Sequence, residues 1–225
     1  MNRNSNYTEE KKAKQYESYY DTTYKRADRL EKKLLTELFA QFEGAKTTLE
    51  VGCGTGHFAR WVESTLKLEC YGVDISRTML SEAKKLWQVG ELLQSDVGGL
   101  PFDDKSVDVT FFVTSLEFMP NATAAIKEAA RVSTKGIVFG LMNKSSPATL
   151  RKRVLAATKE ESFYSDANFY SISKIKRLLF ETFGEGYSIT FWSTTVFPKF
   201  LRDWESSVFP FGAFLGLAVK LRDDL

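Results

Sequence analysis

The stretch Thr47-Thr48-Leu49-Glu50-Val51-Gly52-Cys53-Gly54-Thr55-Gly56 places a short β-prone run directly before three closely spaced glycines. Apolar residues then recur at helical spacing from His57 to Leu66. Glycine permits positive φ angles and leaves no Cβ in the way of a ligand that approaches the backbone. The helix that follows presents free amide groups and the positive end of its dipole. The stretch therefore predicts a strand–turn–helix unit that binds a nucleotide-like ligand.

The residues from 46 to 142 alternate between strand and helix patterns. Strands are predicted at Thr47–Val51, Leu68–Val73, Glu91–Gln94, Val107–Val113 and Gly136–Leu141, and helices at His57–Leu66, Arg77–Val89 and Ala122–Val132. Val107–Val113 is almost wholly apolar or β-branched, as expected of a central parallel strand that is covered on both faces. This order predicts an α/β fold, a mostly parallel sheet with helices on both faces.

The flanking regions complete a single predicted domain over residues 1–225. An amphipathic helix is predicted at 27–42, within an N-terminal helical cap (1–45) that precedes the ligand-binding core (46–142). An inserted helical lid or substrate segment (143–186) and a closing antiparallel strand pair (187–225) follow. Residues 144–177 carry eight Lys or Arg against three acids. This basic segment is either a solvated helical face or a lid that attracts an anionic substrate.

Composition excludes several classes of function. The formal charge of +2 over 225 residues gives no strong nucleic-acid signal. Cys53 and Cys70, the only cysteines, are predicted to be buried thiols in a reducing compartment, and His57 is the only histidine, so no metal site is expected. The polar N-terminus does not resemble a secretory signal, and the longest apolar stretch, Val208–Val219, is too short to span a bilayer. We therefore predict a cytoplasmic protein without a transmembrane segment.

Glycine spacing and two aspartates narrow the ligand. A dinucleotide-binding turn has the pattern G-x-G-x-x-G, whereas this turn has the pattern G-x-G-x-G. Asp74 ends the second predicted strand, where a carboxylate can accept hydrogen bonds from ribose hydroxyls. Asp96 follows the third strand and is expected to reach the same crevice outside the carboxyl ends of the strands.

Three stretches together resemble the class I S-adenosylmethionine-dependent methyltransferases, in particular the type 11 small-molecule group. Leu49–Ala59 is similar to the first motif of that family, and Gly72–Ser76 with Met79-Leu80 to its ribose-binding second strand. Asp96-Val97, Leu100-Pro101-Phe102 and Ser106–Val109 are similar to its adenine-binding turn and fourth strand. The resemblance covers residues 25–142 well and the rest loosely, and implies a Rossmann-like seven-stranded sheet whose last strand is antiparallel.

The resemblance also implies S-adenosyl-L-methionine as the cofactor and a role for each residue of the motifs. Asp74 would bind the ribose hydroxyls, Asp96 the adenine amino group, and the Val97 amide a ring nitrogen. Ile75 and Met79 would pack on the adenine. The remaining expected cofactor contacts come from the first motif: Gly52, Gly54 and Gly56 near the methionine moiety, with Glu50 and Cys53 beside them. Glu50 is as readily interpreted as an acid near a helix terminus.

A catalytic base is not evident. Many members of the family carry His after the fourth strand, where this chain has Ser115-Leu116-Glu117-Phe118. Glu117 and His57 are the candidates, but Glu117 is more simply a carboxylate on the rim of the site and His57 a residue of the first helical turn. We therefore expect catalysis by positioning, since a thiolate or carboxylate acceptor needs no base. Aromatic residues after the core are expected to line the acceptor pocket: Phe163, Tyr164, Phe169, Tyr170 and Trp192.

The leading hypothesis is thus transfer of a methyl group from S-adenosylmethionine to an unidentified, small-molecule acceptor by in-line displacement. The alternative is a non-catalytic S-adenosylmethionine-binding or regulatory protein. A nicotinamide-dependent oxidoreductase is a third possibility, which the glycine spacing disfavours. Neither the acceptor nor the oligomeric state follows from the sequence.

Overall fold

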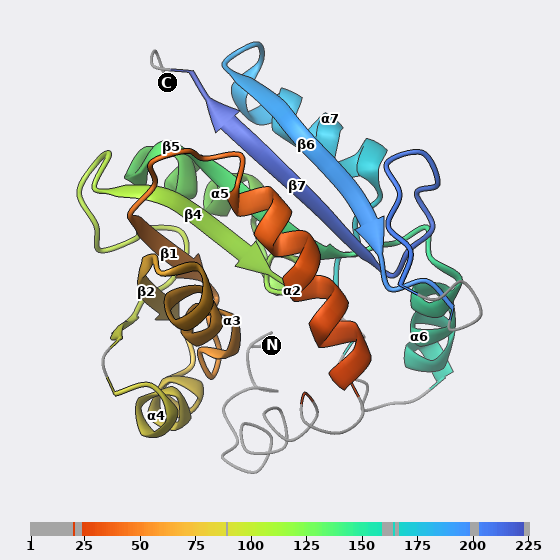
Figure 1. Ribbon diagram of the computed structural model, residues 1–225, viewed down its shortest axis with the longest axis horizontal. Helices are drawn as coiled ribbons and strands as arrows, with labels where there is room; N and C mark the ends of the chain where they lie inside the picture. The colour runs from red at the N-terminus through yellow and green to blue at the C-terminus, as the bar shows by residue number, and fades with distance from the viewer. Residues whose placement is uncertain are drawn as a thin grey trace.

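The computed structural model describes Tyr20, residues 24–88, 90–158, Tyr164, residues 167–198 and residues 203–222. Seven strands form one sheet in the order β3-β2-β1-β4-β5-β7-β6 (Figure 1). The strands are β1 Thr47–Val51, β2 Glu69–Asp74, β3 Glu91–Gln94, β4 Val107–Val113, β5 Ser133–Met142, β6 Tyr187–Thr195 and β7 Phe214–Leu221. The helices that connect them are α2 Lys25–Phe39, α3 His57–Trp61, α4 Arg77–Leu86, α5 Ala122–Val132, α6 Pro147–Thr158 and α7 Ile172–Phe183.

The sheet is mostly parallel, as predicted. β1 pairs in parallel with β2 and with β4, and β5 extends the parallel set beyond β4. The last strand, β7, runs antiparallel to both of its neighbours, β5 and β6. The chain moves outward from β1 to β3 and then returns to β4 on the other side of β1. That reversal of strand order opens a crevice at the carboxyl ends of β1 and β4.

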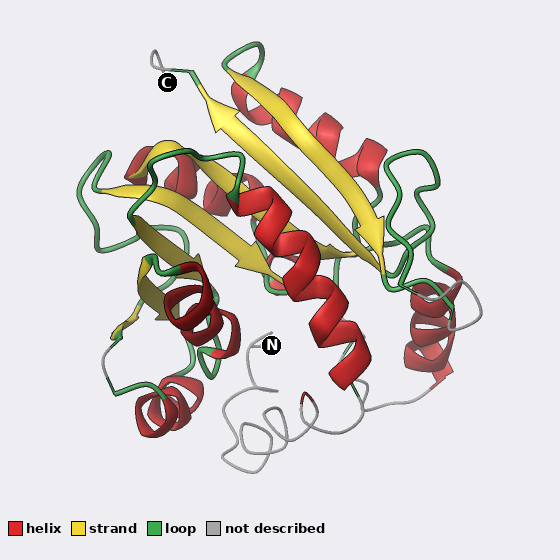
Figure 2. Cartoon of the chain, viewed as in Figure 1, coloured by secondary structure: helices red, strands yellow, loops and turns green. Residues whose placement is uncertain are grey.

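Helices cover both faces of the sheet (Figure 2). On one face, Leu34 and Leu38 of α2 pack with Phe58 of α3 against Phe111. On the other face, Ile126 of α5 and Leu179 of α7 join a core that includes Phe112, Phe139 and Leu217. Neighbouring residues of β4 thus point into different cores, which is why this strand is apolar along nearly its whole length.

Several element boundaries differ from the predicted ones. α2 ends at Phe39 rather than 42, and α4 ends at Leu86 because Trp87 turns inward to pack under Gly56. The predicted helix from His57 continues beyond Trp61 as a single π-helical turn. Within the predicted closing strand pair, β7 begins only at Phe214, since the carbonyls of Pro210 and Gly212 accept hydrogen bonds from the Asn143 side chain instead of a strand neighbour.

The predicted N-terminal cap (1–45) and the predicted buried thiols can be compared with the structure in part or in full. Residues 1–19 of the cap lie outside the described residues, and Tyr20 stacks on His57 with 3.9 Å between ring centroids. Cys53 and Cys70 are buried free thiols, and burial raises the pKa of both. Of the helices in the described ranges, none has the length and apolar character needed to cross a bilayer.

Candidate active site

A cleft lies at the carboxyl ends of β1, β2 and β4, at the reversal of strand order. It encloses about 810 Å³ of empty space, part of it open to solvent. Its lining brings together seven of the predicted site residues: Gly52, Gly54, Asp74, Ile75, Met79, Asp96 and Val97. The opposite wall comes from the end of β4 and the loop after it: Val113, Thr114, Ser115, Phe118, Met119 and Pro120. The topology alone thus gathers residues that are up to 68 positions apart in the sequence.

The glycine turn is held against β2 and bends through the left-handed region. The amides of Gly52 and Cys53 both donate to the Val73 carbonyl, at 2.8 and 2.9 Å. Gly52 has φ +76°, and a Cβ there would come within 2.7 Å of the Ser115 Cβ. Gly54 has φ +56°, but a Cβ there would meet no atom within 4 Å. Gly52 is therefore required by close packing, whereas Gly54 borders the open space of the cleft.

The other three predicted residues of the turn lie outside the described lining of the cleft. Gly56 (φ +74°) packs on Trp87, and the Cys53 thiol points at Gly72 of β2. The buried Glu50 carboxylate accepts a hydrogen bond of 2.8 Å from the Ala59 amide in the first turn of α3. Burial raises the Glu50 pKa well above its usual value. This geometry supports the interpretation of Glu50 as an acid at a helix terminus.

Asp74 joins the turn to the start of α4. One carboxylate oxygen accepts from the Gly54 amide and the other from the Ser76 amide, both at 2.8 Å. Ser76 in turn caps α4 by accepting from the Met79 amide. Burial raises the Asp74 pKa, and the two amide hydrogen bonds oppose that rise by stabilising the charged form. The strand end therefore fixes a carboxylate, in a defined orientation, inside the cleft.

The end of the cleft beyond Asp74 is lined by the apolar side chains of Ile75 and Met79 and by the exposed Asp96. Ile75 is 41% exposed, which is unusual for a large aliphatic side chain, whereas Met79 beneath it is only 1% exposed. Asp96 is exposed, and its carboxylate accepts from the Gly98 amide at 3.0 Å, which shapes the turn that carries Val97.

The wall after β4 was not predicted as part of the lining. Thr114 adopts φ +48°, a strained conformation for a β-branched residue, and its amide donates to the Gly140 carbonyl on β5. Ser115 donates through its hydroxyl to the Val51 carbonyl at 2.7 Å and so ties this wall to the glycine turn. The available signal was topological: in a doubly wound sheet the loop after β4 meets the loop after β1.

Glu117 is fully buried, so the prediction that it lies on the rim is wrong. One carboxylate oxygen accepts from the Met142 amide at the end of β5, and its own carbonyl accepts from the Asn168 amide at 2.7 Å. Its Oε2 atom has no hydrogen-bond partner among the described residues. Burial raises the Glu117 pKa to about 7. The side chain lies behind the cleft wall, since it is not among the lining residues, and links the wall to the carboxyl end of β5.

His57 connects α3 to α2 instead of lining the cleft. Its Nε2 atom lies 2.7 Å from a carboxylate oxygen of Asp28 and 3.1 Å from the Lys32 Nζ atom. Lys32 also pairs with Asp28 at 2.8 Å, and Tyr20 stacks on the imidazole. His57 is thus a residue of the first helical turn that holds the N-terminal helix to the sheet.

The expected aromatic lining is absent from the described cleft. Phe169 and Tyr170 are buried, Tyr170 in the core beneath α7, while Trp192 on β6 carries the Lys176 ammonium at 5.5 Å from its ring centroid. Tyr164 packs on Phe169, and position 163 lies outside the described residues. In the part of the chain that the structure describes, no three potential metal ligands gather at one point.

Comparison with known proteins agrees with this geometry. Residues 49–139 match a family model described as a methyltransferase domain. An uncharacterized protein of Methanocaldococcus jannaschii is 35% identical over 135 residues, which are 59% of this chain and 62% of that protein. The malonyl-[acyl-carrier protein] O-methyltransferase of Yersinia pestis is 30% identical over 115 residues, 50% of this chain and 42% of the relative. The chain therefore spans less than two thirds of the length of these relatives.

The fold similarity extends further than the sequence similarity. A crystal structure from Thermotoga maritima, described as an S-adenosylmethionine-dependent methyltransferase and possible histamine N-methyltransferase, superimposes with a TM-score of 0.72 at 21% identity. The match covers 95% of this chain and 98% of that structure. The matched family model begins in β1, contains the glycine turn, Asp74 and the loop after β4, and ends in β5. Residues 49–139 are thus similar to a methyltransferase domain of the type 11 group, and the chain shares its fold with a structure described as an S-adenosylmethionine-dependent methyltransferase.

Proposed function

We propose that this protein transfers the methyl group of S-adenosylmethionine to a small-molecule acceptor. The observation that carries the proposal is the cleft, which brings the glycine turn, Asp74 and the wall after β4 together. When bound, the cofactor supplies a methyl group on a positively charged sulfonium, which a nucleophile displaces in line. The protein's own task is to align the acceptor and exclude water.

The residues of the cleft fit the cofactor. Gly54 leaves open the space that a Cβ would enter, as a backbone in close contact with a ligand requires. The two Asp74 oxygens hold the Gly54 and Ser76 amides, and a carboxylate has about four lone-pair positions in all, so Asp74 is able to accept from a ribose hydroxyl as well. We assign Ile75 and Met79 to the adenine face, Asp96 to its amino group and the Val97 amide to a ring nitrogen. Gly52 then lies near the methionine moiety.

The remaining first-motif residues support this arrangement indirectly. Glu50 anchors the first turn of α3, and Gly56 allows Trp87 to pack beneath the turn. Cys53 fills the space beside Gly72. Their proposed role is to hold the glycine turn in place, without touching the cofactor.

The acceptor is proposed to lie against the wall after β4. Phe118, Met119 and Pro120 make this wall largely apolar, which helps to exclude water. The ionisable side chains among the described lining residues are Asp74 and Asp96, and both are assigned to the cofactor. Catalysis by positioning follows, with an acceptor that ionises by itself or carries a free lone pair.

The chemistry of the acceptor atom is not narrowed by the relatives' names. The Yersinia pestis protein is named as an O-methyltransferase that acts on malonyl-[acyl-carrier protein], and the Thermotoga maritima structure as a possible N-methyltransferase. Glu117 stands behind the wall and is proposed to position residues 115–119, because its carboxylate and its carbonyl bind the end of β5 and the segment at 168.

Incubation of the protein and a cell extract with methyl-labelled S-adenosylmethionine tests the function, and the labelled product identifies the acceptor. A control is Asp74→Asn, which should reduce labelling of the product about tenfold or more at limiting cofactor concentration, with its folding verified by a melting curve. Tight binding of S-adenosylhomocysteine without any labelled product would contradict the enzyme and support a non-catalytic binding protein. Absence of binding at millimolar concentration would contradict the cofactor assignment itself.

A further inference from the structure

Exposed apolar side chains concentrate on two neighbouring segments beside the active site. Ten large hydrophobic residues are exposed among those that the structure describes, and six of them lie on α6 or on the loop between β6 and β7. We call these six the apolar patch: Leu150, Val154, Trp204, Val208, Phe209 and Phe211. Val208 is 80% exposed and the others between 42% and 56%. A cluster of this kind marks an interaction surface, whereas single exposed hydrophobics need no explanation.

The two segments are joined at their base. The Asn143 side chain, which precedes α6, donates to the carbonyls of Pro210 and Gly212 at 2.8 and 2.7 Å. The Asn143 amide also donates to the Ala213 carbonyl at 2.9 Å, directly before β7, and Figure 1 shows where α6 and β7 lie. The two segments that carry the apolar patch are therefore anchored to each other where they leave the sheet.

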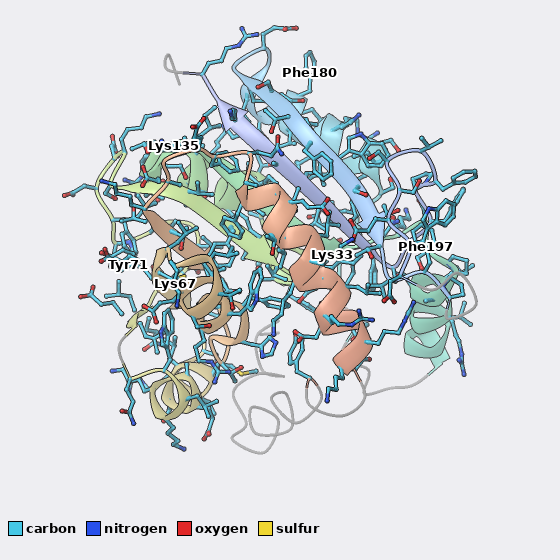
Figure 3. The ribbon with its side chains drawn as sticks, in the orientation of Figure 1. Lys33, Lys67, Tyr71, Lys135, Phe180 and Phe197 are labelled. Atoms are coloured by element: carbon cyan, nitrogen blue, oxygen red, sulfur yellow. The ribbon has the colours of Figure 1, made fainter. Side chains whose placement is uncertain are left out.

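The loop holds its apolar side chains outward by an ordered set of hydrogen bonds. The Ser206 hydroxyl accepts from the amides of Val208 and Phe209 at 3.1 and 2.8 Å. The backbone of Ser206 pairs in both directions with Thr194 at 3.0 Å, and the Thr194 hydroxyl donates to the Phe209 carbonyl. Trp204 packs between Phe197, labelled in Figure 3, and Phe209. The exposure is thus a property of a built loop.

The described acidic side chains beside the apolar patch are paired with α2, whereas basic side chains beside it are exposed. The two acids of the loop, Asp203 and Glu205, pair with Arg29 and Lys33 of α2 at 2.7 and 2.8 Å (Lys33 is labelled in Figure 3). Residues 144–158 contain four Lys or Arg and no acid, and Arg151 is exposed between Leu150 and Val154. A face with exposed aliphatic and aromatic side chains beside the exposed cations Lys144 and Arg151 suits an anionic lipid–water interface.

The apolar patch lies at the same edge of the sheet as the active site. β5 runs parallel to β4 and ends at Met142, which pairs with Phe214 at the start of β7. Residues 143–158 and 203–213 therefore leave the sheet at the carboxyl ends of β4 and β5, the edge that carries the cleft wall.

We propose that the apolar patch docks the protein on an anionic lipid bilayer. Val208 and the aromatic side chains enter the headgroup region while the exposed side chains of Lys144 and Arg151 face the lipid phosphates. A second copy of the chain is a poorer occupant, because face-to-face pairing would bring two basic α6 segments together. The acceptor is then a lipid-soluble molecule that reaches the cleft from the bilayer, a consequence that rests on the proposed methyl transfer.

Vesicle co-sedimentation tests the docking with the full chain and without cofactor. The double variant Val208→Ser/Phe211→Ser removes two exposed side chains of the apolar patch. Its matched control is Phe180→Ser on α7, which is 57% exposed and outside the patch. The wild type and Phe180→Ser should sediment with phosphatidylcholine–phosphatidylglycerol vesicles and less with phosphatidylcholine alone. The double variant should partition at least about tenfold more weakly, and added salt should weaken binding of the wild type.

Three results overturn the docking: no sedimentation of the wild type, equal binding by the double variant and its control, or a dimer in sedimentation equilibrium that the double variant abolishes. Titration with S-adenosylhomocysteine keeps this failure separate from failure of the proposed function. Cofactor binding without vesicle binding refutes the docking alone. Vesicle binding without cofactor binding refutes the methyl transfer and the lipid-soluble acceptor, and leaves the docking supported.

Discussion

Gly54→Ala separates the role of the glycine turn in cofactor binding from its role in the fold. Gly54 has φ +56° and no atom within 4 Å of an added Cβ, and the exposed Gly44 after α2 has φ +68° and only the end of the Lys135 side chain within that range, at 3.9 Å. Alanine at either position therefore costs the left-handed penalty alone, about 1–2 kcal/mol. For a chain of this size that corresponds to a fall in melting temperature of roughly 2–8 °C. Both variants should fold and lose similar stability.

Their cofactor affinities should differ, because only Gly54 lines the cleft. A methyl group forced into space that a ligand fills costs about 1–3 kcal/mol. Since 1.4 kcal/mol is tenfold in affinity, Gly54→Ala should weaken S-adenosylhomocysteine binding by roughly five- to 150-fold. Isothermal titration calorimetry measures that affinity and differential scanning fluorimetry the stability. Equal affinities in Gly54→Ala and Gly44→Ala would refute the placement of the turn against the cofactor.

Three further substitutions test named contacts. Asp74→Asn should weaken S-adenosylhomocysteine binding at least about tenfold, because the Asn side chain cannot accept hydrogen bonds from both backbone amides and from the ribose. A calorimetric affinity equal to that of the wild type would contradict this prediction. As pH rises from 4.5 to 7, the free energy of unfolding of Glu117→Gln should increase relative to that of the wild type by about 3 kcal/mol, as measured by urea unfolding. Asp28→Asn should destabilise by about 1–3 kcal/mol near neutral pH and by less in acid.

The sign of the Glu117 prediction follows from its raised pKa. Between the unfolded pKa of 4.5 and the folded value of about 7, the unfolded chain releases a proton that the folded chain retains. The protonated Glu117 side chain therefore stabilises the fold fully below pH 4.5, and this contribution to the free energy of unfolding is lost as pH rises to about 7. Glu117→Gln shows no such loss, because its side chain does not titrate. A difference between variant and wild type that does not change with pH would show that Glu117 is not a buried carboxylic acid.

The pKa of Asp28 is shifted in the opposite direction from that of Glu117, so its effect on stability has the opposite dependence on pH. Burial acts to raise its pKa, but the hydrogen bonds and charges of His57 and Lys32 outweigh burial and lower it. The carboxylate therefore stabilises the fold above its unfolded pKa, and that contribution is lost as pH falls through the folded pKa. A melting temperature of Asp28→Asn that falls equally at neutral and acidic pH would contradict a charge-based role.

Local pattern determined much of this protein. The strand at 47–51, the glycine turn and the helix at 122–132 lie where their residues predict them, because each relies on interactions within a few positions. Asp74 and Asp96 were predictable residues of the cleft for a related reason: Asp74 ends β2 and Asp96 lies two residues beyond β3, and parallel strands bring their carboxyl ends to one edge.

Only the tertiary structure decided which residues of the turn face the ligand and what stands opposite them. Gly52 and Gly54 both have positive φ, yet one is packed on Ser115 and the other borders open space, a difference that depends on the distant β4 loop. Glu117 looks like an exposed acid in sequence but is buried, since β5 supplies the amide that holds it. Contacts of this kind join positions 25 to 64 residues apart. No local pattern encodes them, because the partner is chosen by how the sheet assembles.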